Sequence, residues 1–494
     1  MKNQVQLIAY ADRLAGDLRG VHDLLGGPLK GLFGGIHLLP FFHPSDGSDA
    51  GFDPIDHTEV DRRLGSWSDI SIIAGDVDVM ADVIVNHISS HSPQFLDFST
   101  RGDQSVYAGM FLTFDGVFPE GATEQDLLAI YRPRPGLPFT PMTLADGSRR
   151  ILWTTFTPEQ IDIDVDHPEG IRYLDNILQN LAENGVRMVR LDAVGYAVKR
   201  RGRSCFMMEE TFDFIGKFSE KARRLKLEVL VEIHSYYQRQ IEVAHQVDWV
   251  YDFALPPLVL HAFFNRNARF LKHWIEIRPV NSLTVLDTHD GIGVIDIGPD
   301  SQDRIGRPGL VPDADLDRLV QQIHANSKGE SLRATGSAAS NLDLYQVNCT
   351  FYDALGRDDT RYLLARAIQF FLPGVPQVYY VGLFAGHNDM TLLEKTGVGR
   401  DINRHYYNRS EIESALEKPL VERLFELIRL RNTHPAFQGT FELVRSPDEV
   451  LDLRWSNGQD FARLRIDLRS DSHRLEFSNG KRSETLGLLE LIDA

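Results

Sequence analysis

The chain has 494 residues, of which 43% are hydrophobic and 25% charged, as is usual for a globular protein. Its formal net charge of −18 argues against nucleic acid or an anionic membrane as a partner, because both are themselves negatively charged. No apolar run is long enough to cross a bilayer, and two cysteines are too few for a disulfide framework. We therefore expect a cytoplasmic protein without a signal peptide, in which Cys205 and Cys349 are free thiols.

Short apolar runs alternate with helical patterns over most of the chain. We predict strands at Val5–Ala9, Gly35–Phe42, Met80–Asn86, Val186–Asp192, Glu228–Glu232, Val247–Phe253, Ser282–Asp287 and Val375–Val381. Their Val, Ile and Leu content fits parallel strands that are buried on both faces. Between them, Leu174, Leu178 and Leu181 share one face of a helix whose expected N-cap is Asp166. Eight strands alternating with helices predict an α/β fold of the (β/α)8 TIM-barrel type.

Two connections are far longer than an ordinary βα loop, and both predict subdomains inserted into the barrel. The first contains the proline-rich run 131–138, which fits a rigid loop, and its two arginines could also bind an anion. The second contains small residues at 334–340 before the polar and aromatic run 341–346, which fits a loop near a site or a plain surface linker. After Pro435, alternating segments predict a small C-terminal antiparallel β-domain. Its expected strands are Phe441–Val444, Val450–Trp455, Phe461–Leu468 and Arg474–Phe477.

Three carboxylates, Asp192, Glu232 and Asp290, come at or after the ends of predicted strands. Since the carboxyl ends of barrel strands meet on one face, we expect these side chains to converge. Arg190 would keep Asp192 ionised and able to act as a nucleophile, although a purely structural ion pair fits that strand end as well. Buried like charges cannot all stay ionised, so one carboxyl should hold a proton, as glycoside chemistry requires. A separation of about 5–5.5 Å between nucleophile and acid would predict retention of configuration.

A metal site is the competing interpretation, because three histidines lie near the same strand ends. They are His87, His234 and His289, and together with the carboxylates they offer nitrogen and oxygen donors. This set contains no His-x-His or Glu-x-x-His spacing, which zinc hydrolases commonly use. A metal site therefore stays open as the less favoured alternative to a site that needs no metal or other cofactor.

Four short segments resemble the sequence regions that mark the α-amylase family, glycoside hydrolase family thirteen. They are Asp82–His87, Arg190–Asp192, Glu232 at the end of a strand, and His289 with Asp290. The resemblance implies that Asp192 is the nucleophile, Glu232 the general acid and base, and Asp290 the stabiliser of the transition state. It also implies that His87 and His289 bind sugar hydroxyls.

Further segments resemble the branch of this family that cleaves sucrose with inorganic phosphate. They are 49–57, 131–138, 285–291, 341–346 and 399–407. The resemblance implies reversible phosphorolysis of sucrose to α-D-glucose 1-phosphate and D-fructose, by double displacement through a β-glucosyl-enzyme intermediate. Sucrose, phosphate and alternative acceptor alcohols would be the ligands. The residues expected to bind the glucosyl unit are Asp49, Phe52, His87, Phe156, Arg190, His289 and Arg400. Those expected to bind fructose or phosphate are Tyr131, Arg134, Tyr196, His234, Asp343, Leu344, Tyr345 and Gln346.

The same resemblance implies a division of the chain into a barrel, two insertions and a C-terminal domain. The barrel takes 1–86, 167–291 and 356–435, the insertions B and B′ take 87–166 and 292–355, and the β-domain takes 436–494.

Sister phosphorylases for sucrose 6′-phosphate, glucosylglycerol or glucosylglycerate share the residues expected to bind the glucosyl unit and stay open as alternatives. So does a retaining α-glucosidase-type hydrolase, although the arginine-bearing loop argues against it. A non-catalytic protein on this fold would be expected to lack one of the three carboxylates. Members of the family occur as monomers and homodimers, and no sequence patch decides between these states.

Overall fold

The computed structural model describes residues 1–47, 49–132, 136–300, 306–335, 346–479 and 482–487. Eight parallel strands close into a barrel in the order β1-β16-β13-β12-β11-β10-β5-β2, which confirms the predicted TIM-barrel fold. Their bounds are β1 (Gln6–Ala9), β2 (Gly35–Leu38), β5 (Asp78–Ile84), β10 (Met188–Asp192), β11 (Glu228–Val231), β12 (Trp249–Asp252), β13 (Ser282–Thr284) and β16 (Val375–Tyr379). Each overlaps one of the predicted runs, and nearly all of their residues are buried, as strands enclosed by helices must be.

Helices fill the connections between the barrel strands and cover the barrel. The longer ones are α2 (Leu18–Gly26), α3 (Trp67–Asp76), α7 (Pro168–Glu183), α8 (Glu209–Arg224), α9 (Tyr237–Ala244), α10 (Leu255–Asn265), α11 (Arg269–Ile277), α15 (Asp359–Phe371), α18 (Arg409–Leu416) and α19 (Pro419–Thr433). Shorter ones are α1 (Ala11–Ala15), α14 (Phe351–Ala354), α16 (Tyr380–Leu383), α17 (Met390–Thr396) and the 3₁₀ turns η2 (Val194–Tyr196), η5 (Gly399–Asn403) and η6 (Pro435–Gln438). A hairpin of β3 (Phe42–Pro44) and β4 (Pro54–Val60) follows β2.

The start of α7 corrects one sequence prediction. Its buried face carries Leu174, Leu178 and Leu181 as expected, but the N-cap is His167 and not Asp166. Pro168 occupies the first turn, where its missing N–H is tolerated, so the helix begins there and the preceding residue becomes the cap. The His167 ring accepts a hydrogen bond from the backbone N–H of Glu169. Asp166 instead forms an ion pair with Arg200 at 2.8 Å.

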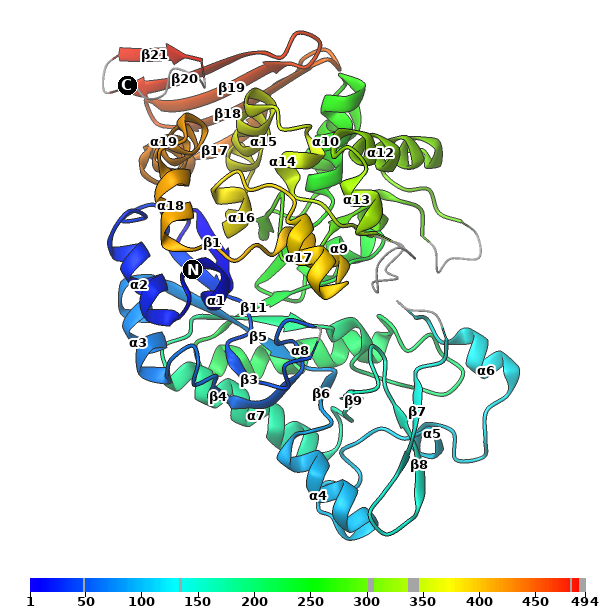
Figure 1. Cartoon of the computed structure of the whole chain (residues 1–494). Coiled ribbons are helices and arrows are strands. Elements are labelled where there is room, and N and C mark those ends of the chain that lie inside the picture. The colour runs from blue at the N-terminus through cyan, green and yellow to red at the C-terminus, as the bar shows by residue number, and fades with distance from the viewer. Residues whose placement is uncertain (48, 133–135, 301–305, 336–345, 480–481, 488–494) are drawn as a thin grey trace.

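The connection between β5 and β10 holds the predicted inserted subdomain. It contains α4 (Pro93–Arg101), η1 (Gly102–Gln104), α5 (Phe114–Val117) and α6 (Glu124–Ala129), with the antiparallel pairs β6 (His87–Ser89)–β9 (Gln160–Asp162) and β7 (Phe139–Thr143)–β8 (Arg149–Trp153). Trp153, Phe118 and Cys205 form a small core of their own. In Figure 1 this cyan lobe and the red C-terminal sheet lie at opposite ends of the molecule. The boundaries of the insertion stay a prediction.

The connection between β13 and β16 holds a second insertion. Its elements are β14 (Ile292–Gly293), η3 (Ile295–Ile297), α12 (Asp313–Asn326), α13 (Glu330–Arg333) and β15 (Gln346–Val347). β14 and β15 pair antiparallel, which places Gly293 opposite Gln346. Both residues therefore lie beside the loop that follows β13, where Asp290 is located.

The C-terminal domain is an antiparallel sheet, as predicted, but its described residues form five strands rather than four. They are β17 (Thr440–Leu443), β18 (Val450–Asn457), β19 (Asp460–Asp467), β20 (Ser472–Asn479) and β21 (Arg482–Leu486). The fifth was missed because its sequence, Arg-Ser-Glu-Thr-Leu, lacks apolar alternation. Trp455 ties the sheet to the barrel, since its indole N–H donates to the carbonyl of Phe371 at 2.7 Å. Within the described ranges, every helix is too short or too polar to cross a lipid bilayer.

Candidate active site

A cavity of about 150 Å³ lies at the carboxyl ends of the barrel strands. It is lined by most of the residues that the sequence predicted for the site, namely Asp49, Phe52, His87, Tyr131, Phe156, Asp192, Tyr196, Glu232, His234, His289, Asp290, Gln346 and Arg400. The expected convergence of the three carboxylates is therefore present. Arg134, Asp343, Leu344 and Tyr345, also predicted to belong to the site, lie outside the described residues.

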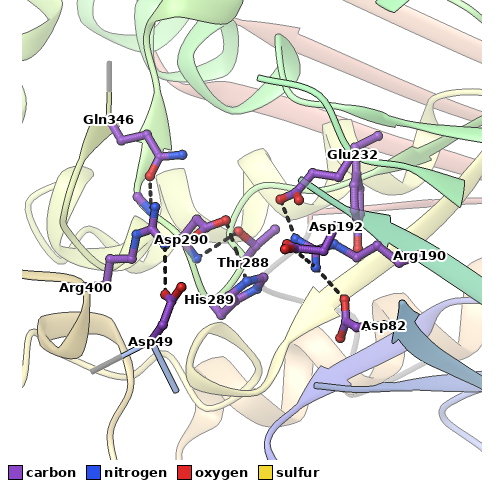
Figure 2. A network of polar contacts seen from close by, with 12 residues as sticks. Asp49, Asp82, Arg190, Asp192, Glu232, Thr288, His289, Asp290, Gln346 and Arg400 are labelled. Atoms are coloured by element: carbon purple, nitrogen blue, oxygen red, sulfur yellow. Dashed lines mark hydrogen bonds and ion pairs between the residues drawn. The ribbon is translucent and has the colours of Figure 1, made fainter. Parts of the chain in front are cut away.

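Arg190 connects three carboxylates on one side of the cavity, and Figure 2 shows it beside Asp192, between Glu232 and Asp82. Its side chain is only 1% exposed, and its Nη1 lies 3.2 Å from Oδ1 of Asp192. The same guanidinium forms ion pairs with Asp82 and Glu232. Strand register explains the arrangement, because Arg190 on β10 lies directly opposite Asp82 on β5, and Glu232 follows β11 on the other side. Since one guanidinium reaches both Asp192 and Glu232, these two carboxyl groups face the same small volume.

One positive charge facing three carboxylates leaves the cluster with excess negative charge. Burial raises the pKa of Asp192 well above its ordinary value, and Arg190 offsets this only in part. Burial also disfavours the charge of Asp82, but Arg190 and His37 outweigh burial and lower its pKa to about 2. His37 contributes through its Nε2, which lies 3.0 Å from Oδ2 of Asp82. The cluster therefore keeps Asp82 ionised and favours a proton on Asp192 in the empty cavity. One buried carboxyl that holds a proton was expected from the sequence, but the expectation that Arg190 keeps Asp192 ionised is wrong for the empty cavity, because burial outweighs the single guanidinium.

Arg400 plays the corresponding part on the opposite side of the cavity (Figure 2). Its Nη1 lies 3.0 Å from Oδ1 of Asp290 and 3.9 Å from Oδ1 of Asp49. Burial raises the pKa of Asp290, but Arg400, the strongest opposing group, helps to bring that pKa far below its ordinary value. Gln160, which the sequence analysis missed, donates from Nε2 to Oδ2 of Asp49 at 2.9 Å. Asp290 is therefore a permanent negative charge on the cavity wall.

The two predicted sugar-binding histidines are neutral and fixed by their neighbours. The ring of His289 stacks on Phe52, with centroids 4.9 Å apart and planes 10° apart, and burial lowers its pKa well below the usual range. His87 is also buried, which lowers its pKa, and its Nε2 lies 3.0 Å from the carbonyl oxygen of Phe52. Because a carbonyl only accepts, this nitrogen carries the hydrogen. Both rings therefore act as oriented polar groups rather than as charges.

Aromatic side chains form another wall of the cavity, and one of them, Phe206, was missed by the sequence analysis. Its ring centroid lies 4.6 Å from that of Tyr131 and 4.6 Å from that of Tyr196. A Cβ at Gly195 would lie 2.7 Å from the Phe206 ring, so glycine is needed beside Tyr196. Phe156 meets Tyr196 edge to face at 5.2 Å. No short motif surrounds Phe206, so its position in the cavity wall could not be predicted from the sequence.

His234 lies beside Glu232 and Asp290, and all three belong to the cavity wall. One ring nitrogen of His234 and one carboxylate oxygen of each neighbour lie within 4.8 Å of one another. Such donors suit a divalent cation, but Glu232 already pairs with Arg190 and Asp290 with Arg400. We assign no metal to this group, and the absence of a metal from the reaction stays a prediction.

Comparisons with known proteins agree with this geometry. The family described as "Alpha amylase, catalytic domain" matches residues 6–248. Together with the barrel and with the full-length relatives below, this match shows that the chain belongs to the α-amylase family. Within it, the chain is 59% identical to sucrose phosphorylase of Agrobacterium vitis, over 98% of this chain and 97% of that one. It is 56% identical to sucrose phosphorylase of Bifidobacterium adolescentis, over 92% and 90%. The crystal structure of sucrose 6F-phosphate phosphorylase from Thermoanaerobacter thermosaccharolyticum superposes with a TM-score of 0.91 at 37% identity, covering 98% of each chain.

Proposed function

We propose that this protein catalyses the reversible phosphorolysis of sucrose to α-D-glucose 1-phosphate and D-fructose, with retention of configuration. The observation that carries the proposal is the meeting of Asp192 and Glu232 on one buried guanidinium at the edge of the cavity. Two neighbouring carboxyl groups in such a place are the requirement for double displacement at an anomeric carbon. The two sucrose phosphorylases described above, similar over almost the whole chain, support sucrose as donor.

In the first step a carboxylate oxygen of Asp192 attacks the anomeric carbon of the glucosyl unit. The bond from that carbon to the fructosyl oxygen breaks, and Glu232 gives this oxygen its proton, so that neutral fructose leaves. A β-glucosyl ester of Asp192 and a Glu232 carboxylate result. Asp290, held ionised by Arg400, faces the positive charge that develops on the sugar ring in the transition state.

In the second step a phosphate oxygen attacks the same carbon from the side that fructose left. The ester bond to Asp192 breaks, its carboxylate is restored, and α-D-glucose 1-phosphate forms. A proton on the entering phosphate passes to Glu232, which regenerates the acid. Two inversions at one carbon give net retention, and the steps require no metal or organic cofactor.

The protonation of the free site fits this sequence once sucrose is bound. In the empty cavity burial favours a proton on Asp192, as its raised pKa indicates. A glycosidic oxygen beside Glu232 accepts a hydrogen bond from the protonated acid, which favours that protonation state. Asp192 is then left ionised next to Arg190, 3.2 Å away, and is ready to attack.

The rest of the donor pocket suits a single glucosyl unit. Asp49 and Arg400 line the cavity and offer a carboxylate and a guanidinium to sugar hydroxyls. The two groups form an ion pair with each other, with Nη1 of Arg400 3.9 Å from Oδ1 of Asp49. Phe52 and Phe156 offer aromatic faces to the apolar face of the sugar ring. For phosphate, an anion entering a protein of net charge −18, we propose Arg134 as the nearby cation, since its guanidinium matches phosphate oxygens.

The substrates of the related phosphorylases share the glucosyl unit with sucrose and differ in the group that leaves. Comparing several glucosyl donors therefore tests the proposal. The purified protein is incubated with phosphate and with sucrose, sucrose 6′-phosphate, glucosylglycerol or glucosylglycerate, and glucose 1-phosphate is measured. We expect sucrose to give the highest kcat/KM. A higher value for one of the other donors would move the assignment to that substrate and keep the mechanism.

We further propose that small alcohols replace phosphate as acceptors, because attack on the glucosyl ester requires only a hydroxyl group in the same place. Both cysteines are buried free thiols, which fits a cytoplasmic location. Size-exclusion chromatography with light scattering distinguishes a monomer from a homodimer.

A further inference from the structure

His234 lines the cavity and pairs with Asp296, a buried carboxylate, and neither residue takes part in the steps above. Asp296 is fully buried, and its Oδ2 accepts a hydrogen bond from Nδ1 of His234 at 2.8 Å. Its Oδ1 accepts from the backbone N–H of Ser235 at 3.1 Å and from Nε2 of Gln240 at 2.8 Å. Three donors thus hold the carboxylate in place. By accepting from Nδ1, the carboxylate also fixes the orientation of the His234 ring and so the direction in which Nε2 points.

The packing around the pair leaves the imidazole one orientation. Its ring stacks on Phe253, with centroids 3.9 Å apart and planes 15° apart. A Cβ at Gly293 would lie 2.2 Å from Oδ2 of Asp296 and 3.0 Å from Nδ1 of His234. Position 293 of β14 must therefore be glycine for the strand to lie this close to the pair. Within the described part of the chain, Nε2 of His234 has no hydrogen-bond partner, and His234 lines the cavity. A ligand is therefore the natural partner of Nε2.

Three carboxylates surround the ring, each from a different segment. Asp296 belongs to η3, Glu232 follows β11, and Asp290 lies in the loop after β13. Burial by itself lowers the pKa of His234, but these carboxylates, Asp296 first, outweigh burial and raise the pKa. Burial raises the pKa of Asp296. The pair of imidazolium and carboxylate therefore exists only at pH values above the pKa of Asp296 and below that of His234. The carboxylates therefore extend the pH range in which the imidazolium of His234 is present.

We propose that Asp296 and His234 form a protonation switch that adapts Nε2 to whichever acceptor occupies the cavity. With Nδ1–H donated to Asp296, the neutral ring presents a lone pair at Nε2, which accepts a hydrogen bond from a fructose hydroxyl. The protonated ring presents Nε2–H and a positive charge, which suit an oxygen of phosphate. Asp296 is a positioning residue in this scheme, since it acts only through His234. The inference rests on the proposed function, which supplies fructose and phosphate as the two ligands.

The direction of the pH effect follows from the raised pKa. The imidazolium, and with it the donor to phosphate, is present below the pKa of His234 and is lost as the pH rises through it. Asp296→Asn removes the nearest negative charge, lowers that pKa, and moves the loss to lower pH. At pH 7 we expect kcat/KM for phosphate to fall about 10- to 100-fold, as for a lost hydrogen bond to a charged group. Hydrolysis of the glucosyl enzyme should change much less, because water requires no imidazolium.

The test compares pH profiles of kcat/KM for phosphate in the wild type and in Asp296→Asn. The ionisation of phosphate is the same in both, so any difference between the profiles belongs to the enzyme. The matched control is Asp315→Asn, which makes the same change at another pair, where Oδ2 of Asp315 lies 3.0 Å from Nε2 of His261, away from the cavity. We expect the control to leave the phosphate profile unchanged.

Two results would overturn the switch. One is an unchanged phosphate profile in Asp296→Asn, and the other is an equal loss of hydrolysis and phosphorolysis. An NMR titration of the wild-type histidines, with His234 assigned by its loss in His234→Gln, decides the matter even if Asp296→Asn does not fold. A His234 pKa below the ordinary histidine value would contradict the proposal. If the wild type forms no glucose 1-phosphate at all, the proposed function has failed, and the titration still tests the pair.

Discussion

The donor side and the acceptor side of the cavity are built in different ways. On the donor side, Arg190 and Arg400 pair with carboxylates that lie at the ends of barrel strands or in the connections that follow them. On the acceptor side, Tyr131 and Gln346 come from the two insertions. Aromatic rings pack against one another there, and His234 pairs with Asp296 of the second insertion. The difference teaches that the barrel fixes the chemistry at the anomeric carbon, whereas the insertions select what leaves and what enters. Changes on the donor side should therefore affect every acceptor equally.

The largest effect should come from Asp192→Asn, because no other carboxylate replaces the attacking oxygen. Loss of a nucleophile that acts together with an acid lowers kcat by at least about 10⁴-fold. We expect phosphorolysis, hydrolysis and transfer to alcohols to disappear together, as measured by release of fructose from sucrose. Thermal unfolding of the variant serves as the control for folding. A variant with wild-type rates would exclude Asp192 as the nucleophile.

Glu232→Gln should come next, with a loss of about 10²- to 10⁴-fold for sucrose, the range of general acid catalysis. α-D-Glucosyl fluoride should restore part of the first step, since fluoride leaves without a proton. Steady-state rates with both donors check this expectation. If the fluoride is as poor a substrate as sucrose, Glu232 is not the acid and the distinction between the two carboxyl groups fails.

Arg400→Lys should have a smaller effect that is the same for all acceptors. Lysine keeps the charge but cannot reach both Asp290 and Asp49 in the same way, so kcat/KM for sucrose should fall about 10- to 100-fold. The matched control is Arg333→Lys, at an exposed pair where Nη2 of Arg333 lies 2.7 Å from Oε1 of Glu394. A loss confined to phosphate would place Arg400 on the acceptor side and break the comparison.

Arg134→Ala should give the smallest effect, and only with phosphate. We expect the KM for phosphate to rise about tenfold or more, as for a lost hydrogen bond to an ionised group, while slow hydrolysis of sucrose continues at its former rate. Initial rates across a phosphate series, with and without the substitution, measure both quantities. An equal fall in hydrolysis and phosphorolysis would show that Arg134 supports the fold of the loop instead.

Much of the barrel and the donor side could be predicted from the sequence, because their signals are local. An apolar run ends in a carboxylate, and parallel strands bring such ends to one face, so Asp192, Glu232 and Asp290 were predictable as a group. Arg190 stands two residues before Asp192, and that spacing puts both on the same face of β10.

Partners that are distant in sequence could not be predicted. Asp296 follows His234 by many residues and meets it only because β14 and η3 fold back over the end of β11. Gln160 reaches Asp49 from β9, and Phe206 has no motif around it. The N-cap of α7 was wrong because the rule that a proline begins the helix outweighed the preference for an acidic cap. For Asp296, Gln160 and Phe206, tertiary packing rather than a nearby pattern decides the contact.

The central claim is that phosphate, and not water, takes the glucosyl unit from Asp192. The most direct measurement is an incubation of the purified protein with sucrose, with and without inorganic phosphate, in which glucose 1-phosphate, glucose and fructose are quantified. We predict that, with phosphate, glucose 1-phosphate equals fructose, and that without it fructose release is slow. Fructose matched by free glucose at the same rate in both incubations would contradict the account and make the protein a hydrolase.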